Sequence, residues 1–129
     1  MDASSHKLAA LLAERLAGVL PRPLTVRAEG HRLLITAGGS PQCGSAAAII
    51  VEDPGDDLDA RIETAATAVL SDVQDCVAHI LTEPWPPAQP YGMLPPPGAR
   101  ATASTVRLWY GDEENPCVTL PPIDKTELR

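Results

Sequence analysis

The chain has 129 residues, 44% of them hydrophobic, which is enough for one domain with one hydrophobic core. Its 17 acidic and 10 basic residues give a formal net charge of −7. A nucleic-acid-binding domain needs a basic face, so this balance argues against that class. The longest apolar stretches are far too short to span a membrane, and we therefore expect no membrane segment.

The N-terminus and the cysteines favour a cytoplasmic protein. Residues 1–7 are polar and lack the basic start of a signal peptide. The three cysteines, Cys43, Cys76 and Cys117, are odd in number and far apart, with no C-x-x-C pair. We therefore expect free thiols in a reducing compartment. Arginine is preferred over lysine and phenylalanine is absent, a usage typical of GC-rich codons, which favours a bacterial source.

The first predicted element is an amphipathic helix. Apolar residues recur at helical spacing from residue 8 to residue 20 and form one stripe. Ser4 or Ser5 can cap its start, and Pro21 and Pro23 end it. Because only one side is apolar, the helix is expected to rest on a sheet.

A hairpin follows, built on alternating apolar residues around Gly30 and His31. A Gly-X pair suits a type II′ turn, in which the glycine takes a positive φ. With that turn, apolar side chains of the two strands meet on one face, which indicates a matched register. The predicted pairs are Glu29 with Arg32, Ala28 with Leu33, Val26 with Ile35, and Leu24 with Ala37.

The middle of the chain is expected to hold a loop, a buried strand and a long helix. Residues 38–45 are rich in Gly, Ser and Pro and predict the loop. The apolar run 46–51 predicts a central strand. Helical spacing from residue 58 to 81 predicts the helix, capped by Asp53 or Asp56 and ended before Pro84. This helix is long for the sheet, and its excess apolar length predicts a symmetric homodimer.

Residues 84–97 contain seven prolines and form a Pro-rich strap that can be neither helix nor central strand. We expect the strap to be docked, with Trp85 buried near the end of the second helix beside Trp109 or Tyr110. Alternatively, its P-x-x-P sequence is a ligand for an SH3- or WW-like domain. Strands are predicted at 105–110 and 117–120, and a loose tail at 121–129.

Together these elements predict a single domain over residues 1–129 of the α+β class. The order is α-β-β-β-α, the strap, then β-β, arranged as a two-layer α/β sandwich with a mainly antiparallel, five-stranded sheet. Over residues 4–120 this order of elements resembles the core of type III secretion chaperones and related small two-layer domains. The resemblance is one of element order and implies a fold of this kind.

Several segments resemble known binding motifs but lack residues that those motifs require. Residues 39–45 have the glycine spacing of a P-loop but lack its lysine and precede a predicted strand. Residues 53–59 are acidic, but Leu58 stands where a calcium loop needs glycine and Thr64 where it needs glutamate. Asp72, Asp75 and His79 share one helical face, but no further metal ligands follow at a telling spacing. We expect neither a metal nor a cofactor.

Nucleophilic catalysis is not indicated either. A Cys–His dyad of Cys43 with His31 or His79 needs a proximity that spacing does not provide. No G-x-S-x-G or H-E-x-x-H sequence occurs. The sequence therefore leans away from an enzyme.

Two further features of the sequence are a cluster of acidic residues and the position of the aromatic residues in the C-terminal part of the chain. Residues 52–83 carry nine acidic and one basic side chain, a face that would suit a basic partner, and all four aromatic residues follow residue 84. We expect a non-enzymatic cytoplasmic protein that binds another, unidentified protein, as an adaptor or chaperone-like factor. The candidate contact residues are Asp72, Asp75, His79, Trp85, Tyr91 and Trp109.

The alternative is a small-ligand binder or small enzyme with a pocket between the sheet and the strap. A pocket lined by His31, Cys43 and Trp109 together would favour it.

Overall fold

The computed structural model describes residues 3–38, 40–49, 57–87 and 94–128. The first half holds α1 (Ala3–Ala17), β1 (Thr25–Glu29), β2 (Arg32–Ala37) and β3 (Ser40–Ala46). The second half holds α2 (Leu58–Leu81), β4 (Pro97–Ala101), β5 (Thr105–Gly111), β6 (Pro116–Asp124) and the 3-10 helix η1 (Lys125–Leu128). The α+β class and the predicted order of helices and strands are confirmed.

The strands form two antiparallel sheets of three, β1-β2-β3 and β4-β5-β6, where one sheet of five was expected. The extra strand is β4, which begins at the last proline of the strap. A strand can start on a proline because its first residue need not donate to the ladder.

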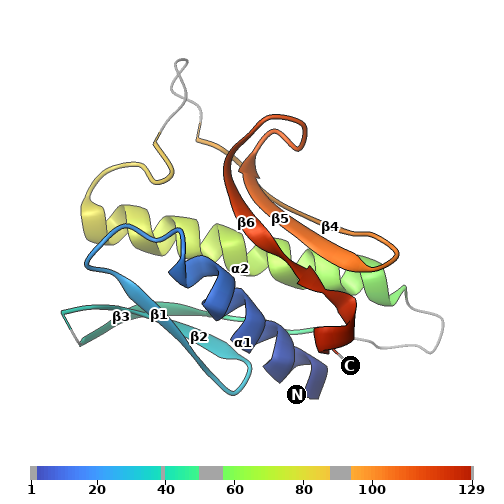
Figure 1. The fold of residues 1–129 in the computed structure, drawn as a ribbon. Coiled ribbons are helices and arrows are strands. Elements are labelled where there is room, and N and C mark those ends of the chain that lie inside the picture. The colour runs from blue at the N-terminus through green and yellow to red at the C-terminus, as the bar shows by residue number, and fades with distance from the viewer. Residues whose placement is uncertain (1–2, 39, 50–56, 88–93, 129) are drawn as a thin grey trace.

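α2 lies between edge strands of the two sheets, and α1 packs against strands of both sheets. α2 crosses between them and packs against β3 on one side and β4 on the other, while α1 packs against β1, β2 and β6 (Figure 1). Sheet edges carry unpaired backbone groups, so a helix beside an edge shields it from other chains. Glu63 of α2 shows this directly, since its carboxylate accepts a hydrogen bond of 3.3 Å from the backbone N–H of Ala101 on β4.

One hydrophobic core lies inside this arrangement and draws on both helices and both sheets. Its largest fully buried side chains include Leu8, Leu12 and Leu16 from α1 and Leu70 from α2. At its centre, the hydroxyl of Tyr110 on β5 donates a 2.7 Å hydrogen bond to the backbone carbonyl of Leu70. This bond satisfies the one polar group that the buried tyrosine brings into the core.

The predicted hairpin is confirmed. Gly30 has a φ of 63° and sits in the turn between β1 and β2. The register pairs Glu29 with Arg32, Ala28 with Leu33, and Val26 with Ile35, as the alternation required. The fourth predicted pair, Leu24 with Ala37, is not part of the ladder, because β1 begins at Thr25. Turn chemistry and hydrophobic pattern agreed here, which is why a local signal was sufficient.

The prediction of a loop at 38–45 was wrong, because β3 occupies most of this range. β3 is an edge strand whose register shifts opposite Ile35 and Thr36, and a proline is tolerated at such an irregularity. Gly44 is required there, because a Cβ would collide with the backbone carbonyl of Leu33.

Of the strand expected at 46–51, only Ala46 is in a strand, as the last residue of β3. Residues 47–49 belong to no strand, although the backbone N–H of Ala47 still donates to the carbonyl of His31 at 2.8 Å, and Ala47 and Ile49 are buried. The backbone N–H of Ile49 donates to the hydroxyl of Ser5, at 3.1 Å. Ser5 is thus a buried helix residue rather than a cap, since α1 already includes Ala3. Residues 50 and 51 lie outside the described residues.

The N-cap of α2 lies one residue after Asp56, the later of the two expected caps. The carboxylate of Asp57 accepts hydrogen bonds from the backbone N–H groups of Asp59 and Ala60, at 3.0 and 3.4 Å. Asp57 is therefore the N-cap. The expected caps, Asp53 and Asp56, lie outside the described residues.

The strap is docked at its two described ends. Trp85 is 8% exposed and meets Tyr110 edge-on, with ring centroids 5.3 Å apart, as expected. At the other end, the side-chain amide of Gln74 donates to the carbonyl of Pro95, at 2.7 Å. Residues 88–93, which include Tyr91, lie outside the described residues.

The C-terminal segment is not the loose tail that was expected. β6 runs to Asp124, beyond the predicted strand, and η1 follows it. Leu128 is buried in the core, and the side chain of Lys125 forms an ion pair with Asp59 near the start of α2. The segment therefore closes one end of the domain.

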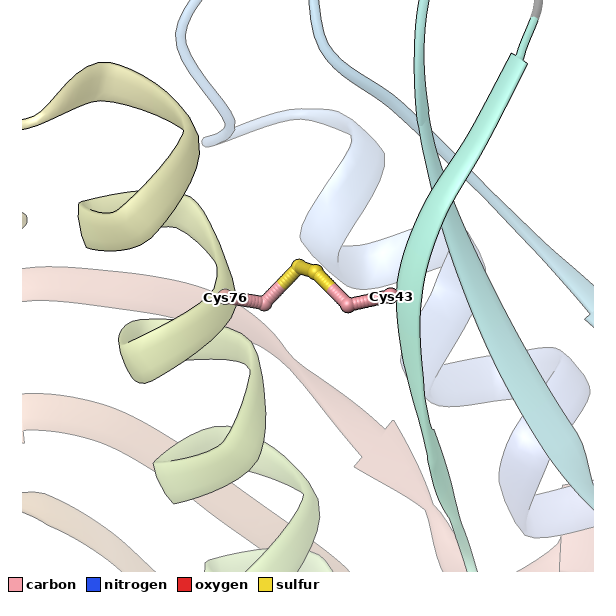
Figure 2. The surroundings of a disulfide bond; sticks show 2 residues. All are labelled: Cys43 and Cys76. Carbon is pink, nitrogen blue, oxygen red and sulfur yellow. A yellow bond between two sulfur atoms is a disulfide. The ribbon is translucent and has the colours of Figure 1, made fainter.

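The expectation of free thiols was wrong for two of the three cysteines. Cys43 on β3 and Cys76 on α2 form a disulfide with a Cα–Cα distance of 6.1 Å, within the usual range (Figure 2). The pairing follows from β3, which places Cys43 alongside the helix rather than in a loop. Cys117 is exposed and is not part of a disulfide.

Candidate partner-binding surface

The candidate contact residues occupy three separate places. Asp72, Asp75 and His79 lie on the exposed side of α2, and Trp85 lies in the interior. Trp109 lies on the face of the second sheet that points away from the core. Tyr91 is outside the described residues. These residues do not form one site, so each place has to be judged by its own contacts.

The acidic face of α2 is partly structural. The carboxylate of Asp72 accepts a 2.7 Å hydrogen bond from the hydroxyl of Ser45 on β3, while Asp75 and His79 are exposed to solvent. Among the described residues, no group of three His, Cys, Asp or Glu side chains could hold a metal ion. This face offers charge, but Asp72, Asp75 and His79 do not line either of the two hollows described below.

The residues of the alternative pocket are also separated. His31 stacks on His6 with ring centroids 6.1 Å apart, and Cys43 is in the disulfide. Both belong to the side of the first sheet, whereas Trp109 is on β5 of the second. The pocket that would have favoured a ligand binder or enzyme is therefore not formed by these three residues.

Among the described residues, Trp109 is the one aromatic candidate on an outer face. Its neighbours along β5, Leu108 and Tyr110, are buried in the core, so alternation turns Trp109 the opposite way. Its register partner on β4 is Gly98. A Cβ at Gly98 would overlap the indole, so the ring lies flat on the glycine backbone. The glycine therefore leaves room for the aromatic ring to pack directly on the backbone of the sheet.

Charged side chains hold this outer face together. The guanidinium of Arg107 lies over the Trp109 ring, 5.5 Å from its centroid, a cation–π geometry. Glu113, in the turn between β5 and β6, makes a two-point contact with Arg100, of which the Nη2–Oε1 distance is 2.6 Å. It also lies 3.4 Å from Arg107. The hydrogen bond from Arg100 lowers the pKa of Glu113 below its ordinary value.

These ion pairs bridge strands and turn. Figure 1 shows the end of the β5–β6 hairpin curving out of line with its strands. Glu113 at that end reaches residues in the middle of β4 and β5, so the hairpin end folds back toward the sheet. The indole is sheltered as a result and is only 8% exposed.

A hollow of about 320 Å³ lies on this face, where the pairing of β5 and β6 is irregular. Val106 pairs with Ile123 but Leu108 pairs with Leu120, so two residues of β6 stand opposite the single Arg107. Such a bulge opens a sheet surface locally. The lining residues are Thr105, Arg107, Leu108, Trp109, Pro116, Thr119, Leu120 and Pro122. We call this site the outer-face hollow.

A larger but shallower depression of about 480 Å³ lies between α2 and the start of β4. Its lining is made of small or short side chains, namely Glu63, Thr64, Thr67, Ala68, Ser71 and Pro97. It has no aromatic ring and no cation, so it lacks the anchors typical of binding sites.

Sequence reasoning found Trp109 but missed Arg107, Thr119 and Glu113. The sequence feature that could have revealed this face is Gly98 on β4, which pairs with Trp109 on the neighbouring strand β5. That pairing could not be recognised without β4, and β4 was not predicted because it begins at the last proline of the strap.

No helix among the described residues is long and apolar enough to cross a membrane. Comparisons of the chain with protein families, with curated proteins and with solved structures gave no match. The likeness to type III secretion chaperones therefore rests on the order of elements alone.

Proposed function

We propose that this is a non-enzymatic cytoplasmic protein that binds another protein through the outer-face hollow. The observation that carries the proposal is Trp109, seated on Gly98 and lining a hollow that is open to solvent. Tryptophan and arginine are enriched among the residues that dominate binding energies, and they act most strongly in pockets that exclude water.

The chemistry of the hollow suits one apolar side chain of a partner. Its volume of about 320 Å³ is sufficient for such a side chain, and indole and proline rings form much of its wall. The hydroxyls of Thr105 and Thr119 lie on the lining and can bond to a partner backbone. The rings are already held in place by the sheet, so a partner would lose little free energy in ordering them.

A small molecule is the second candidate occupant. The volume of the hollow is at the lower end of the range for small-ligand sites, which favours this alternative specifically. The two occupants differ in what they cover, because a protein also contacts the rim and a small molecule stays inside.

Photo-crosslinking in the native cell separates these possibilities. A photoreactive amino acid at Thr119 probes the outer-face hollow, and the same residue at Thr64 probes the exposed side of α2 as a matched control. We expect a discrete protein adduct from position 119 and none from position 64. The adduct should disappear when Trp109 is replaced by leucine.

Each other result has a defined meaning. An adduct near twice the mass of 13.6 kDa identifies a second copy of the chain as the partner, as the long helix predicts. No protein adduct from position 119 contradicts the proposal. An adduct from position 64 alone would mean that the partner binds the exposed side of α2 and not the outer-face hollow.

A further inference from the structure

We propose that the Cys43–Cys76 disulfide is a redox-reversible link that fixes β3 to α2 when oxidised and releases that edge of the first sheet when reduced by a dithiol. This site lies apart from the outer-face hollow, so the proposal stands independently of the proposed function.

The fold does not require a covalent staple. Small domains with few buried residues depend on disulfides, whereas this chain of 129 residues has one continuous core that includes both helices and both sheets. The disulfide joins Cys43, which packs against the core, to Cys76, which belongs to it, over a sequence separation of 33. Because the other core residues come from both helices and both sheets, we expect the core to persist when this bond is broken.

The link is accessible from one side. Cys43 is partly exposed on an edge strand, while Cys76 is buried at 7% exposure against the helix face. Because Cys43 is the more exposed of the two residues, we expect an attacking thiolate to approach the sulfur of Cys43, with the sulfur of Cys76 as the leaving group. Figure 2 shows the bridge passing directly from the strand to the helix.

Reduction is a two-step exchange. A thiolate of the dithiol forms a bond to the sulfur of Cys43, the Cys43–Cys76 bond breaks, and Cys76 leaves as a thiolate that takes a proton. The second thiol of the dithiol then attacks the mixed disulfide and releases Cys43. Two electrons pass from the dithiol, which becomes a disulfide, to the protein, which gains two thiols.

The consequence follows from how β3 is held. Cys43 and Ser45 lie two apart on the strand, and their partners Cys76 and Asp72 lie one turn apart on α2, so both links share one face. Reduction leaves β3 paired with β2 and, toward α2, joined by the hydrogen bond of Ser45 to Asp72. β3 contains Pro41 and Gly44, which are poor strand formers, so it is the part of the sheet that loosens first.

The test uses the intact protein with Cys117→Ser, which removes the third thiol. The native protein is equilibrated with mixtures of reduced and oxidised dithiothreitol of increasing reduced fraction, quenched with acid, and its thiols are counted by a maleimide mass shift. We expect two thiols to appear together without denaturant. In the reduced form, amide hydrogen exchange in β3 should rise about tenfold or more, with β5 unchanged.

Any of three results overturns the proposal. If the thiols appear only after denaturant is added, the disulfide is a permanent staple. If they appear but exchange in β3 stays unchanged, the bond is reversible without releasing the strand. The variant Cys43→Ser/Cys76→Ser serves as the permanently reduced control. It should show the fast exchange in β3 in every buffer, and slow exchange in this variant also contradicts the proposal.

Discussion

Replacing Trp85 with alanine tests whether the Pro-rich strap is anchored to the core. The indole is 8% exposed and packs edge-on against Tyr110 at 5.3 Å. Removing a buried tryptophan costs about 3–5 kcal/mol, which combines lost transfer free energy with the cavity left behind. At an unfolding entropy of about 2.1 cal/mol/K per residue, this loss lowers the Tm of a domain of this length by roughly 10–20 °C.

Urea denaturation at 25 °C, followed by far-UV circular dichroism, measures the free energy of unfolding without relying on tryptophan fluorescence. Trp85→Phe is the control, because it retains a ring against Tyr110 and should lose about 1–2 kcal/mol. A loss below about 1 kcal/mol for Trp85→Ala would refute the anchor. It would favour the interpretation of the strap as a ligand for an SH3- or WW-like domain.

Three further predictions concern single groups. Tyr110→Phe should lower the free energy of unfolding by about 1–2 kcal/mol, because its buried hydroxyl donates to the carbonyl of Leu70. Burial also raises the pKa of Tyr110 above its ordinary value of 10.0, so the folded state should lose stability as pH rises past that value. This loss, measured in alkaline urea titrations, should be smaller in the phenylalanine variant, and an equal loss would contradict the assignment. Gly98→Ala should cost about 1–3 kcal/mol, because its methyl group meets the indole of Trp109, and urea curves matching those of the unchanged protein would show that the ring does not lie on Gly98. The carboxyl of Glu113 should titrate below 4.5 in carbon NMR, so its contribution to stability is present above that pH and fades as pH falls further. Arg100→Ala should move this titration midpoint upward, and an unmoved midpoint would mean that Arg100 is not the cause.

Local signals were sufficient wherever the turn and the apolar pattern agreed. The hairpin at Gly30 followed from one glycine and two alternating strands, and the register held residue by residue. The long helix followed from its periodicity, although Asp57 rather than Asp56 caps it. The burial of Trp85 followed from the size of its ring and the stiffness of the strap around it.

Features that depend on distant segments were not accessible in this way. β3 contains a proline and a glycine, and only its position at a sheet edge makes that composition acceptable. Because β3 was not predicted, the proximity of Cys43 to Cys76 could not be foreseen either.

The candidate site was hidden for a similar reason. Trp109 was identified by its type alone, but its seat on Gly98 depends on strand pairing across the second sheet. The contacts of Glu113 depend on the curvature of the hairpin, which alternation and turn residues do not specify. The contacts of this site therefore depend on the pairing of strands that are distant in sequence, which the local sequence pattern does not specify.

The most direct test of the proposed function is the affinity of the crosslinked partner, once purified, for two matched variants. Thr119→Arg fills the outer-face hollow from its exposed rim and leaves the indole packing in place, while Thr64→Arg adds the same charge to the exposed side of α2. A hot-spot contact worth about 2 kcal/mol predicts a Kd raised roughly 30-fold for Thr119→Arg. The Kd of Thr64→Arg should stay within about twofold of the unchanged protein. An unchanged Kd for Thr119→Arg, in a variant that melts at the normal temperature, would contradict binding through this hollow.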